Sequence, residues 1–97
     1  MVIYEVSLKV EAAVADDFRT WLAEHVQDML RQPGFTGAQG FERQDGDGLE
    51  LVVHYQVKDR AALEHYFQHG AAQMRGDGLR RFGDRFQASR RILVPLE

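Results

Sequence analysis

The sequence predicts an α+β fold in which a four-stranded antiparallel sheet carries two main helices on one face. Two observations predict it. In several segments apolar and polar residues alternate with a period of two, which is typical of strands with one buried face. In the segments between them, apolar residues recur every three or four positions, as on an amphipathic helix. With 97 residues, 44% of them hydrophobic, the chain has the size of one domain, and we assign residues 1–97 to it.

The first strand and the first helix follow directly from these two periods. Residues 2–10 alternate strictly and predict a strand. Its apolar face holds Val2, Tyr4, Val6, Leu8 and Val10. From Val14 onward the spacing becomes helical, and Asp16 and Asp17 lie near the positive end of the helix dipole. The dipeptide Pro33-Gly34 is expected to stop this helix.

A β-hairpin is expected next. Residues 35–43 and 49–57 are two strand-like runs. The residues between them are Gln44-Asp45-Gly46-Asp47-Gly48, a turn composition that tolerates positive φ. These two runs therefore form the second and third strands.

The remaining elements are a second helix and a last strand. Asp59 can cap the helix. The apolar stripe of this helix holds Leu63, Tyr66, Phe67, Ala71 and Met74. Gly70, Gly76 and Gly78 predict a break and a shorter helical piece that ends near Phe82. Residues 85–94 form the last strand. The resulting order, βαββαβ, is that of a ferredoxin-like sandwich with strand order 4-1-3-2.

This strand order predicts which residues face each other in the sheet. The first and third strands are antiparallel neighbours whose apolar sets both point to the helices, so Tyr4 faces Tyr55. On the other face Glu5 then meets His54. Which side chains of residues 35–43 point to the helices stays open. Turns of different length shift the pairing of this strand by one residue, and each shift turns the other set of side chains toward the helices. The two sets are Phe35, Gln39 and Phe41, or Thr36, Ala38 and Glu42.

The face of the sheet without helices is mixed in character. Ile3, Val52 and Leu93 lie there among charged and polar residues. A partly apolar sheet face needs a cover, and a two-fold dimer whose sheets face each other supplies one. We therefore predict that the partner of this chain is a second copy, in a homodimer.

Composition excludes several classes of function. Fifteen acidic and twelve basic residues give a net charge of −3, which offers no general attraction to nucleic acid. RNA-recognition domains share the βαββαβ order, but the open face of the third strand here offers Glu50, Val52 and His54 instead of stacking aromatics. Cysteine is absent, which excludes disulfides and thiolate metal sites. No apolar run reaches the ~18 residues of a membrane span and no leader is apparent, so we expect a cytoplasmic protein.

The sharpest candidate site combines Glu5 with His54. A carboxylate beside an imidazole can hold the histidine in one tautomer as a general base. Arg91 can bind an anionic ligand if the last strand brings it opposite Glu5. The alternative is a structural polar pair at the dimer interface, and ion-pair networks of this kind are common without catalysis.

Three other residues complete the candidate set. His25 lies on the apolar stripe of the first helix, as an acid–base group or as a half-buried structural histidine. Arg43 is a second candidate anion anchor, and Tyr55 a candidate ligand-binding residue. His65 and His69 have i, i+4 spacing, but no third ligand is apparent and we expect neither a metal nor another cofactor.

Several segments resemble one known family. They are Ile3-Tyr4-Glu5-Val6, Trp21-Leu22-Ala23-Glu24-His25-Val26, Gly34-Phe35-Thr36, His54-Tyr55 and the run from Arg81 to Arg91. The chain resembles an uncharacterised bacterial domain-of-unknown-function family of the dimeric α+β barrel superfamily, over nearly its whole length. The resemblance implies a ferredoxin-like protomer and a dimer, and no established activity. Small haem-degrading and quinone-forming members of the superfamily use asparagine, tryptophan and histidine, whereas this chain has no asparagine.

Two functions follow from these observations. The first is a non-catalytic dimeric module with a small anionic or aromatic ligand in a cleft between sheet and helices. The second is a cofactor-free enzyme, monooxygenase-like or isomerase-like, with His54 or His25 as base and Arg91 or Arg43 as anion anchor. An enzyme needs a partly apolar pocket with convergent polar groups, so a cavity beside Glu5 and His54 would favour the second.

Overall fold

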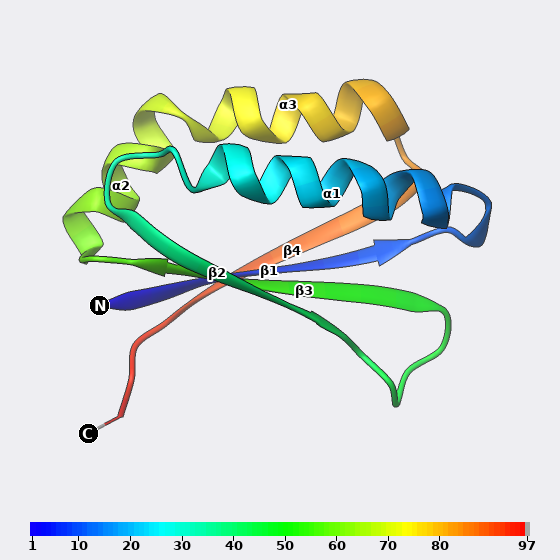
Figure 1. Cartoon of the computed structure of the whole chain (residues 1–97), viewed down its shortest axis with the longest axis horizontal. Helices are drawn as coiled ribbons and strands as arrows, with labels where there is room; N and C mark the ends of the chain where they lie inside the picture. The colour runs from blue at the N-terminus through cyan, green and yellow to red at the C-terminus, as the bar shows by residue number, and fades with distance from the viewer. Residues whose placement is uncertain (97) are drawn as a thin grey trace.

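The computed structural model describes residues 1–96 and has the predicted βαββαβ order. The elements are β1 (Val2–Val10), a 3-10 turn (Ala12–Val14), α1 (Ala15–Met29), β2 (Phe35–Glu42), β3 (Leu49–Val57), α2 (Arg60–His69), α3 (Ala71–Phe82) and β4 (Phe86–Leu93). The sheet order is β2-β3-β1-β4, which is the predicted 4-1-3-2 read from the other edge. The helices all lie on one face of the sheet, with α1 and α3 side by side above it (Figure 1). This is the predicted ferredoxin-like α+β fold, with its helices on one face of a four-stranded antiparallel sheet.

The register of the two central strands is the predicted one. Tyr4 lies opposite Tyr55 and Glu5 opposite His54. On the other side of β1, Arg91 of β4 lies opposite Glu5, and Arg90 lies opposite Val6. Because neighbouring residues of a strand point to opposite faces, Arg91 lies on the open face and Arg90 on the face that the helices cover.

The open question of β2 is resolved by a bulge. Phe35 lies opposite Val57, and the register then shifts before Gly37, so that Ala38 lies opposite Tyr55. An extra residue reverses the parity of a strand, so Phe35 and Ala38 both face the helices, although they belong to alternative predicted sets. Phe41, opposite Val52, faces away from the helices.

The predicted break in the second helical segment occurs at Gly70. It separates α2 from α3, and α3 ends at Phe82 as predicted. Of the three glycines that predicted the break, only Gly70 lies at it, whereas Gly76 and Gly78 lie inside α3. Packing explains the glycine at 78, since an added Cβ would lie 3.0 Å from the Cη2 atom of Trp21. Gly78 thus permits close approach of α3 to α1, a tertiary contact that outweighs its poor helix propensity.

The core has two parts, which meet near Val6 and Leu22. One part lies beneath α2 and includes Tyr4, Phe35, Tyr55, Val57, Leu63 and Tyr66. The other lies near the start of α1 and includes Leu8, Val10, Phe18, Leu51 and Phe82. Val6 is only partly buried although Tyr4 and Leu8 beside it are buried. No helix within residues 1–96 is long and apolar enough to cross a membrane.

Candidate functional site

A pocket lies between the sheet and the helices, where the two parts of the core meet. Its volume is about 40 Å³. The sheet contributes Tyr4, Val6, Leu8, Val53, Tyr55, Phe86 and Arg90 to its lining. The helices contribute Trp21, Leu22, His25, Met29, Tyr66, Met74, Arg75 and Gly78. The lining is mostly apolar and aromatic with a few polar groups, which is the composition of a small-molecule site.

Three tyrosines form the end of the pocket nearest α2. The ring of Tyr4 lies 6.1 Å from that of Tyr55 and 5.9 Å from that of Tyr66, between centroids. Burial raises the pKa of Tyr66 to about 12 and also raises the pKa of Tyr55. Both hydroxyl groups therefore keep their protons at neutral pH and can donate hydrogen bonds.

Two arginines reach the same pocket from opposite sides. The Nη2 atom of Arg75, on α3, donates a hydrogen bond of 3.1 Å to the hydroxyl oxygen of Tyr4. Arg90 comes from the edge strand β4, and its charge acts on both His25 and Tyr66. Neither arginine takes part in any ion pair within residues 1–96.

His25 lines the pocket from α1. Its ring stacks on Trp21, with centroids 4.5 Å apart and planes 23° from parallel. Burial lowers the pKa of His25, and this effect exceeds the opposing influence of the carboxylates of Asp77 and Asp28. The imidazole is thus neutral at neutral pH and can accept a proton or a hydrogen bond.

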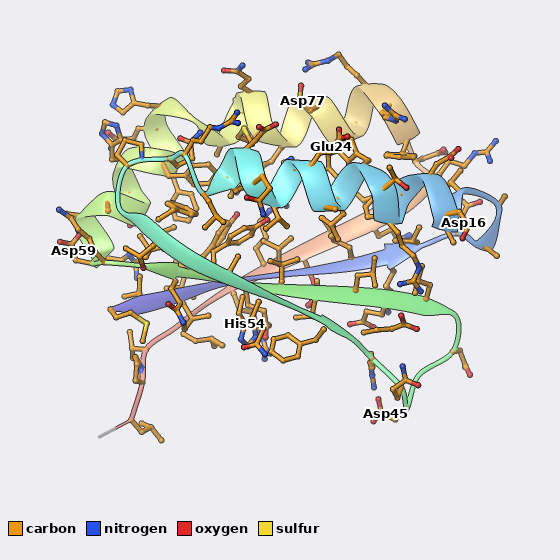
Figure 2. All side chains as sticks on the ribbon, viewed as in Figure 1. Asp16, Glu24, Asp45, His54, Asp59 and Asp77 are labelled. Atoms are coloured by element: carbon orange, nitrogen blue, oxygen red, sulfur yellow. The ribbon has the colours of Figure 1, made fainter. Side chains whose placement is uncertain are left out.

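Glu5, His54 and Arg91 meet on the opposite face of the sheet. The carboxylate of Glu5 lies 2.9 Å from Nε2 of His54 and 2.6 Å from Nε of Arg91. Figure 2 shows His54 on the side of the sheet away from the helices. The hydrogen bond from Arg91 lowers the pKa of Glu5; burial opposes this shift and the contact with His54 adds to it. The predicted contacts of Glu5 are therefore present, but they are separated from the pocket by the sheet itself.

The surroundings of this polar cluster differ from those of the pocket. The ring of Phe41 packs edge-on against His54, with centroids 5.1 Å apart. None of the five main cavities of residues 1–96 is lined by Glu5 or His54. The pocket with convergent polar groups thus lies on the helix-covered face of the sheet and not beside Glu5 and His54.

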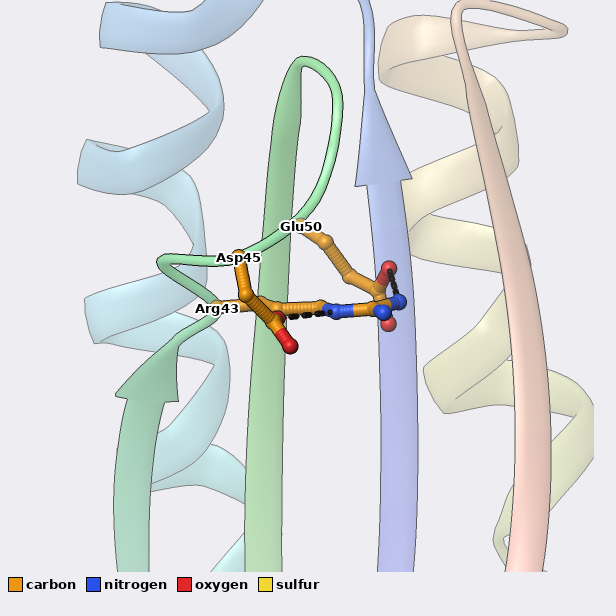
Figure 3. A network of polar contacts seen from close by, with 3 residues as sticks. All are labelled: Arg43, Asp45 and Glu50. Carbon is orange, nitrogen blue, oxygen red and sulfur yellow. Dashed lines mark hydrogen bonds and ion pairs between the residues drawn. The ribbon is translucent and has the colours of Figure 1, made fainter.

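Arg43 lies apart from both groups, beside the β2–β3 turn. Its guanidinium contacts the carboxylates of Asp45 at 2.7 Å and Glu50 at 3.4 Å (Figure 3). The rings of His65 and His69 lie 4.5 Å apart on α2. Within residues 1–96 there is no group of three or more histidine, aspartate or glutamate side chains that could hold a metal ion.

Of the predicted site residues, the pocket contains only His25 and Tyr55. The sequence interpretation missed Arg75, Arg90 and the other two tyrosines as pocket residues. Arg90 had a usable signal, because the pairing that places Arg91 opposite Glu5 directs its neighbour to the other face. Arg75 follows the buried Met74, and no sequence pattern indicated that it lines the pocket. Helical spacing shows which side of a helix is apolar, but it does not show whether a residue at the edge of that side reaches the pocket.

Comparison with known proteins agrees with this architecture. Residues 1–96 match the family model described as Domain of unknown function (DUF4286). No curated protein matches the chain.

Among solved structures, SnoaB, a cofactor-independent oxygenase from Streptomyces nogalater, is 19% identical with a TM-score of 0.75; the match covers 99% of this chain and 93% of that one. An ethyl tert-butyl ether d (ethd) family protein from Bacillus halodurans is 12% identical with a TM-score of 0.73, over 99% of this chain and 100% of that one. The heme-degrader MhuD from Mycobacterium tuberculosis is 18% identical with a TM-score of 0.72, over 100% of this chain and 98% of that one. At these identities the likeness concerns the fold.

Proposed function

The chain belongs to the family described as Domain of unknown function (DUF4286), and from this premise we propose that it is a non-catalytic module that binds a small ligand and forms a homodimer. The observation that carries the proposal is the pocket between sheet and helices. Apolar and aromatic walls surround it, and polar groups from α1, α2, α3 and the sheet converge on it. Such an arrangement binds and orients a small molecule.

The size of the pocket limits the ligand. A buried water requires roughly 10–15 Å³ of such space, so the pocket of about 40 Å³ holds a group of only a few non-hydrogen atoms. A larger ligand would need side chains to move. Met29 and Met74 both line the pocket, and methionine is the apolar side chain that changes shape most readily.

The homodimer is proposed from the opposite face of the sheet. Phe41 is 44% exposed there opposite the partly buried Val52, and the partly buried Ile3 of β1 lies on the same face. No helix covers this face (Figure 1). A second copy placed sheet to sheet would bury these apolar groups. It would also enclose the Glu5–His54–Arg91 cluster, which favours a structural role for that cluster.

The binding proposal is tested by nuclear magnetic resonance. A library of small fragments is titrated into ¹⁵N-labelled protein, and amide shifts are followed. Binding at the pocket should shift residues near Tyr4, His25 and Tyr66 together and leave the hairpin around Arg43 unchanged. Shifts confined to the hairpin or to the open sheet face, or no shifts from any fragment, would contradict a ligand site in the pocket.

One observation favours a second candidate function, a cofactor-free oxygenase-like or isomerase-like enzyme. His25 is neutral and lines the pocket, so it can act as a general base toward a bound aromatic or anionic substrate. A test is incubation of the protein with 1,4-dihydroxynaphthalene under ¹⁸O₂. Oxygenase chemistry inserts one oxygen atom to give 2-hydroxy-1,4-naphthoquinone and releases the other as water, whereas simple oxidation to the quinone gives hydrogen peroxide and no label in the product. Label incorporation that the protein accelerates and that His25→Ala abolishes, with His54→Ala unaffected, would establish this function in place of the first.

A further inference from the structure

We propose that the ligand of the pocket is a small carboxylate whose anionic end is held by Arg75 and Arg90. This inference rests on the proposed function, because it names the chemical class of the ligand in the same pocket. Its basis is the charge of the lining and the protonation of the tyrosines.

The charged side chains that line the pocket are all cationic. They are Arg75 and Arg90, both exposed residues, and no aspartate or glutamate is among the lining residues. The carboxylate of Asp77, whose charge acts on His25, is engaged by Arg80 in the neighbouring turn of α3. The carboxylate of Asp28, which also acts on His25, is engaged by Arg31. The two cationic lining residues therefore have no acidic partner in the wall of the pocket.

These two arginines also differ from most others in the chain. Arg19, Arg31, Arg43, Arg60, Arg80 and Arg91 each pair with an aspartate or glutamate within residues 1–96. Arg75 instead donates to the uncharged hydroxyl of Tyr4. A guanidinium satisfied only by a hydroxyl keeps donors free, and its planar fork matches the two oxygens of a carboxylate.

The tyrosines add donors to this cationic end. With their pKa values raised by burial, Tyr55 and Tyr66 present hydroxyl protons at neutral pH. Within residues 1–96 neither hydroxyl has a charged hydrogen-bond partner, while Tyr4 already accepts from Arg75 and so can direct its own proton to a ligand. Several donors facing one small volume suit an acceptor-only group, which an ionised carboxylate is.

The rest of the lining indicates the remainder of the ligand. Trp21, Phe86 and Leu22 are among the apolar lining residues. Phe86 lies opposite Val10, toward the other end of β1 from Tyr4. A short apolar chain attached to the carboxylate would pack against these apolar lining residues. Inorganic phosphate has oxygens on all sides and would leave some of them against these apolar walls without partners. The geometry thus favours a short aliphatic carboxylate over a phosphate.

The test compares butyrate with butyramide, which has nearly the same shape and no charge. Each is titrated into the full-length protein at pH 7 and low ionic strength, with amide and Trp21 indole shifts as the readout. We expect butyrate to bind about tenfold or more tightly than butyramide, with shifts at His25 and Trp21. Arg90→Gln and Arg75→Gln should each weaken butyrate binding by about tenfold and leave butyramide binding unchanged.

The matched control is Arg85→Gln, which removes one positive charge near the start of β4 but outside this pocket. It should leave butyrate binding within about twofold, because charges at the surface are screened. Circular dichroism spectra and thermal melts confirm that each variant is folded. Arg90→Lys keeps the charge without the planar fork and should retain part of the affinity.

Each outcome decides the proposal. Equal binding of butyrate and butyramide in the pocket would overturn the carboxylate inference and leave the proposed function in place. Phosphate binding there more tightly than butyrate would also overturn the inference. If fragments bind the pocket but none of them is a carboxylate, the carboxylate inference is overturned and the proposed function stands. A complete absence of binding at the pocket would reject both the inference and the proposed function.

Discussion

Replacement of Glu5 by glutamine tests whether the polar cluster on the open sheet face stabilises the fold. Glu5 is 6% exposed and accepts hydrogen bonds at 2.9 Å and 2.6 Å from His54 and Arg91. Glutamine has the same shape, so the substitution removes the charge and little volume. It leaves no buried charge behind, because the side chains of His54 and Arg91 are 32% and 70% exposed and return to water.

The expected loss of stability depends on how exposed the partners of Glu5 are. Hydrogen bonds to a charged group contribute roughly 1.5–3 kcal/mol each when buried, and exposed partners reduce this contribution strongly. We expect the free energy of unfolding of Glu5→Gln to fall by about 1–2 kcal/mol at pH 7. If the dimer encloses the cluster as proposed, the loss should be larger at high protein concentration than at low.

The contribution of Glu5 to the free energy of unfolding depends on pH. The pKa of Glu5 is lowered in the folded protein from its ordinary value of 4.5, so the stabilisation is fully present above about pH 4.5. It disappears as the pH falls through the lower pKa of the folded state. The wild-type protein and Glu5→Gln should therefore converge in stability in acid.

The assay is urea unfolding followed by circular dichroism, from pH 7 to pH 3 at one fixed protein concentration. The matched control is Glu64→Gln, since Glu64 pairs with Arg60 at 2.9 Å but is 48% exposed. That control should change stability by less than about 0.5 kcal/mol. A Glu5→Gln variant as stable as the wild type at pH 7, or one whose deficit is the same at every pH, would refute the reasoning.

Three further predictions concern the pocket, the dimer and the helix cap. Gly78→Val should push against the Trp21 ring, because even a Cβ would lie 3.0 Å from it, and ligand-induced amide shifts at the pocket should be lost in a folded protein. Phe41→Asp should convert a dimer into a particle of 11.1 kDa by sedimentation equilibrium. Gln73→Asp, at an exposed position of α3 in the helix layer, should not. A dimer that survives Phe41→Asp would argue against this interface. Asp59→Ala removes the 2.8 Å hydrogen bond that the backbone amide of Ala62 donates to the Asp59 carboxylate. This should lower the free energy of unfolding by about 1 kcal/mol in urea titrations; an unchanged midpoint would show that α2 does not depend on its cap.

The outcome at particular residues shows how far sequence patterns reach. The pairing of Tyr4 with Tyr55 could be predicted because β1 and β3 are central, alternate strictly and share one apolar face. The contact of Arg91 with Glu5 was predicted only on the condition that the last strand brings Arg91 opposite Glu5, and the structure shows that it does. Which side chains of β2 point to the helices could not be predicted. This edge strand has a bulge between Phe35 and Gly37, and the alternation of inward and outward side chains reverses there.

The candidate site divides in the same way. The pairing of Glu5 with His54 was predicted from strand register, and Arg91 was named there only on the condition that β4 places it opposite Glu5. The pocket was predicted only as a cleft between sheet and helices, and only His25 and Tyr55 of its residues were named. Arg75 and Tyr66 enter it from two different helices, whose rotation about their own axes depends on packing.

Sequence alone determined the order of the elements, the face of each central strand and the contacts that follow from strand pairing, since these depend on a local period of two and on hydrogen bonds between known neighbours. Tertiary structure alone decided the place of the helix break, the close approach of α3 to α1 at Gly78 and the gathering of tyrosines and arginines around one cavity. These features arise where side chains distant in sequence compete for the same volume. No local pattern encodes the result of that competition, because it depends on how all the neighbouring side chains fill the space together.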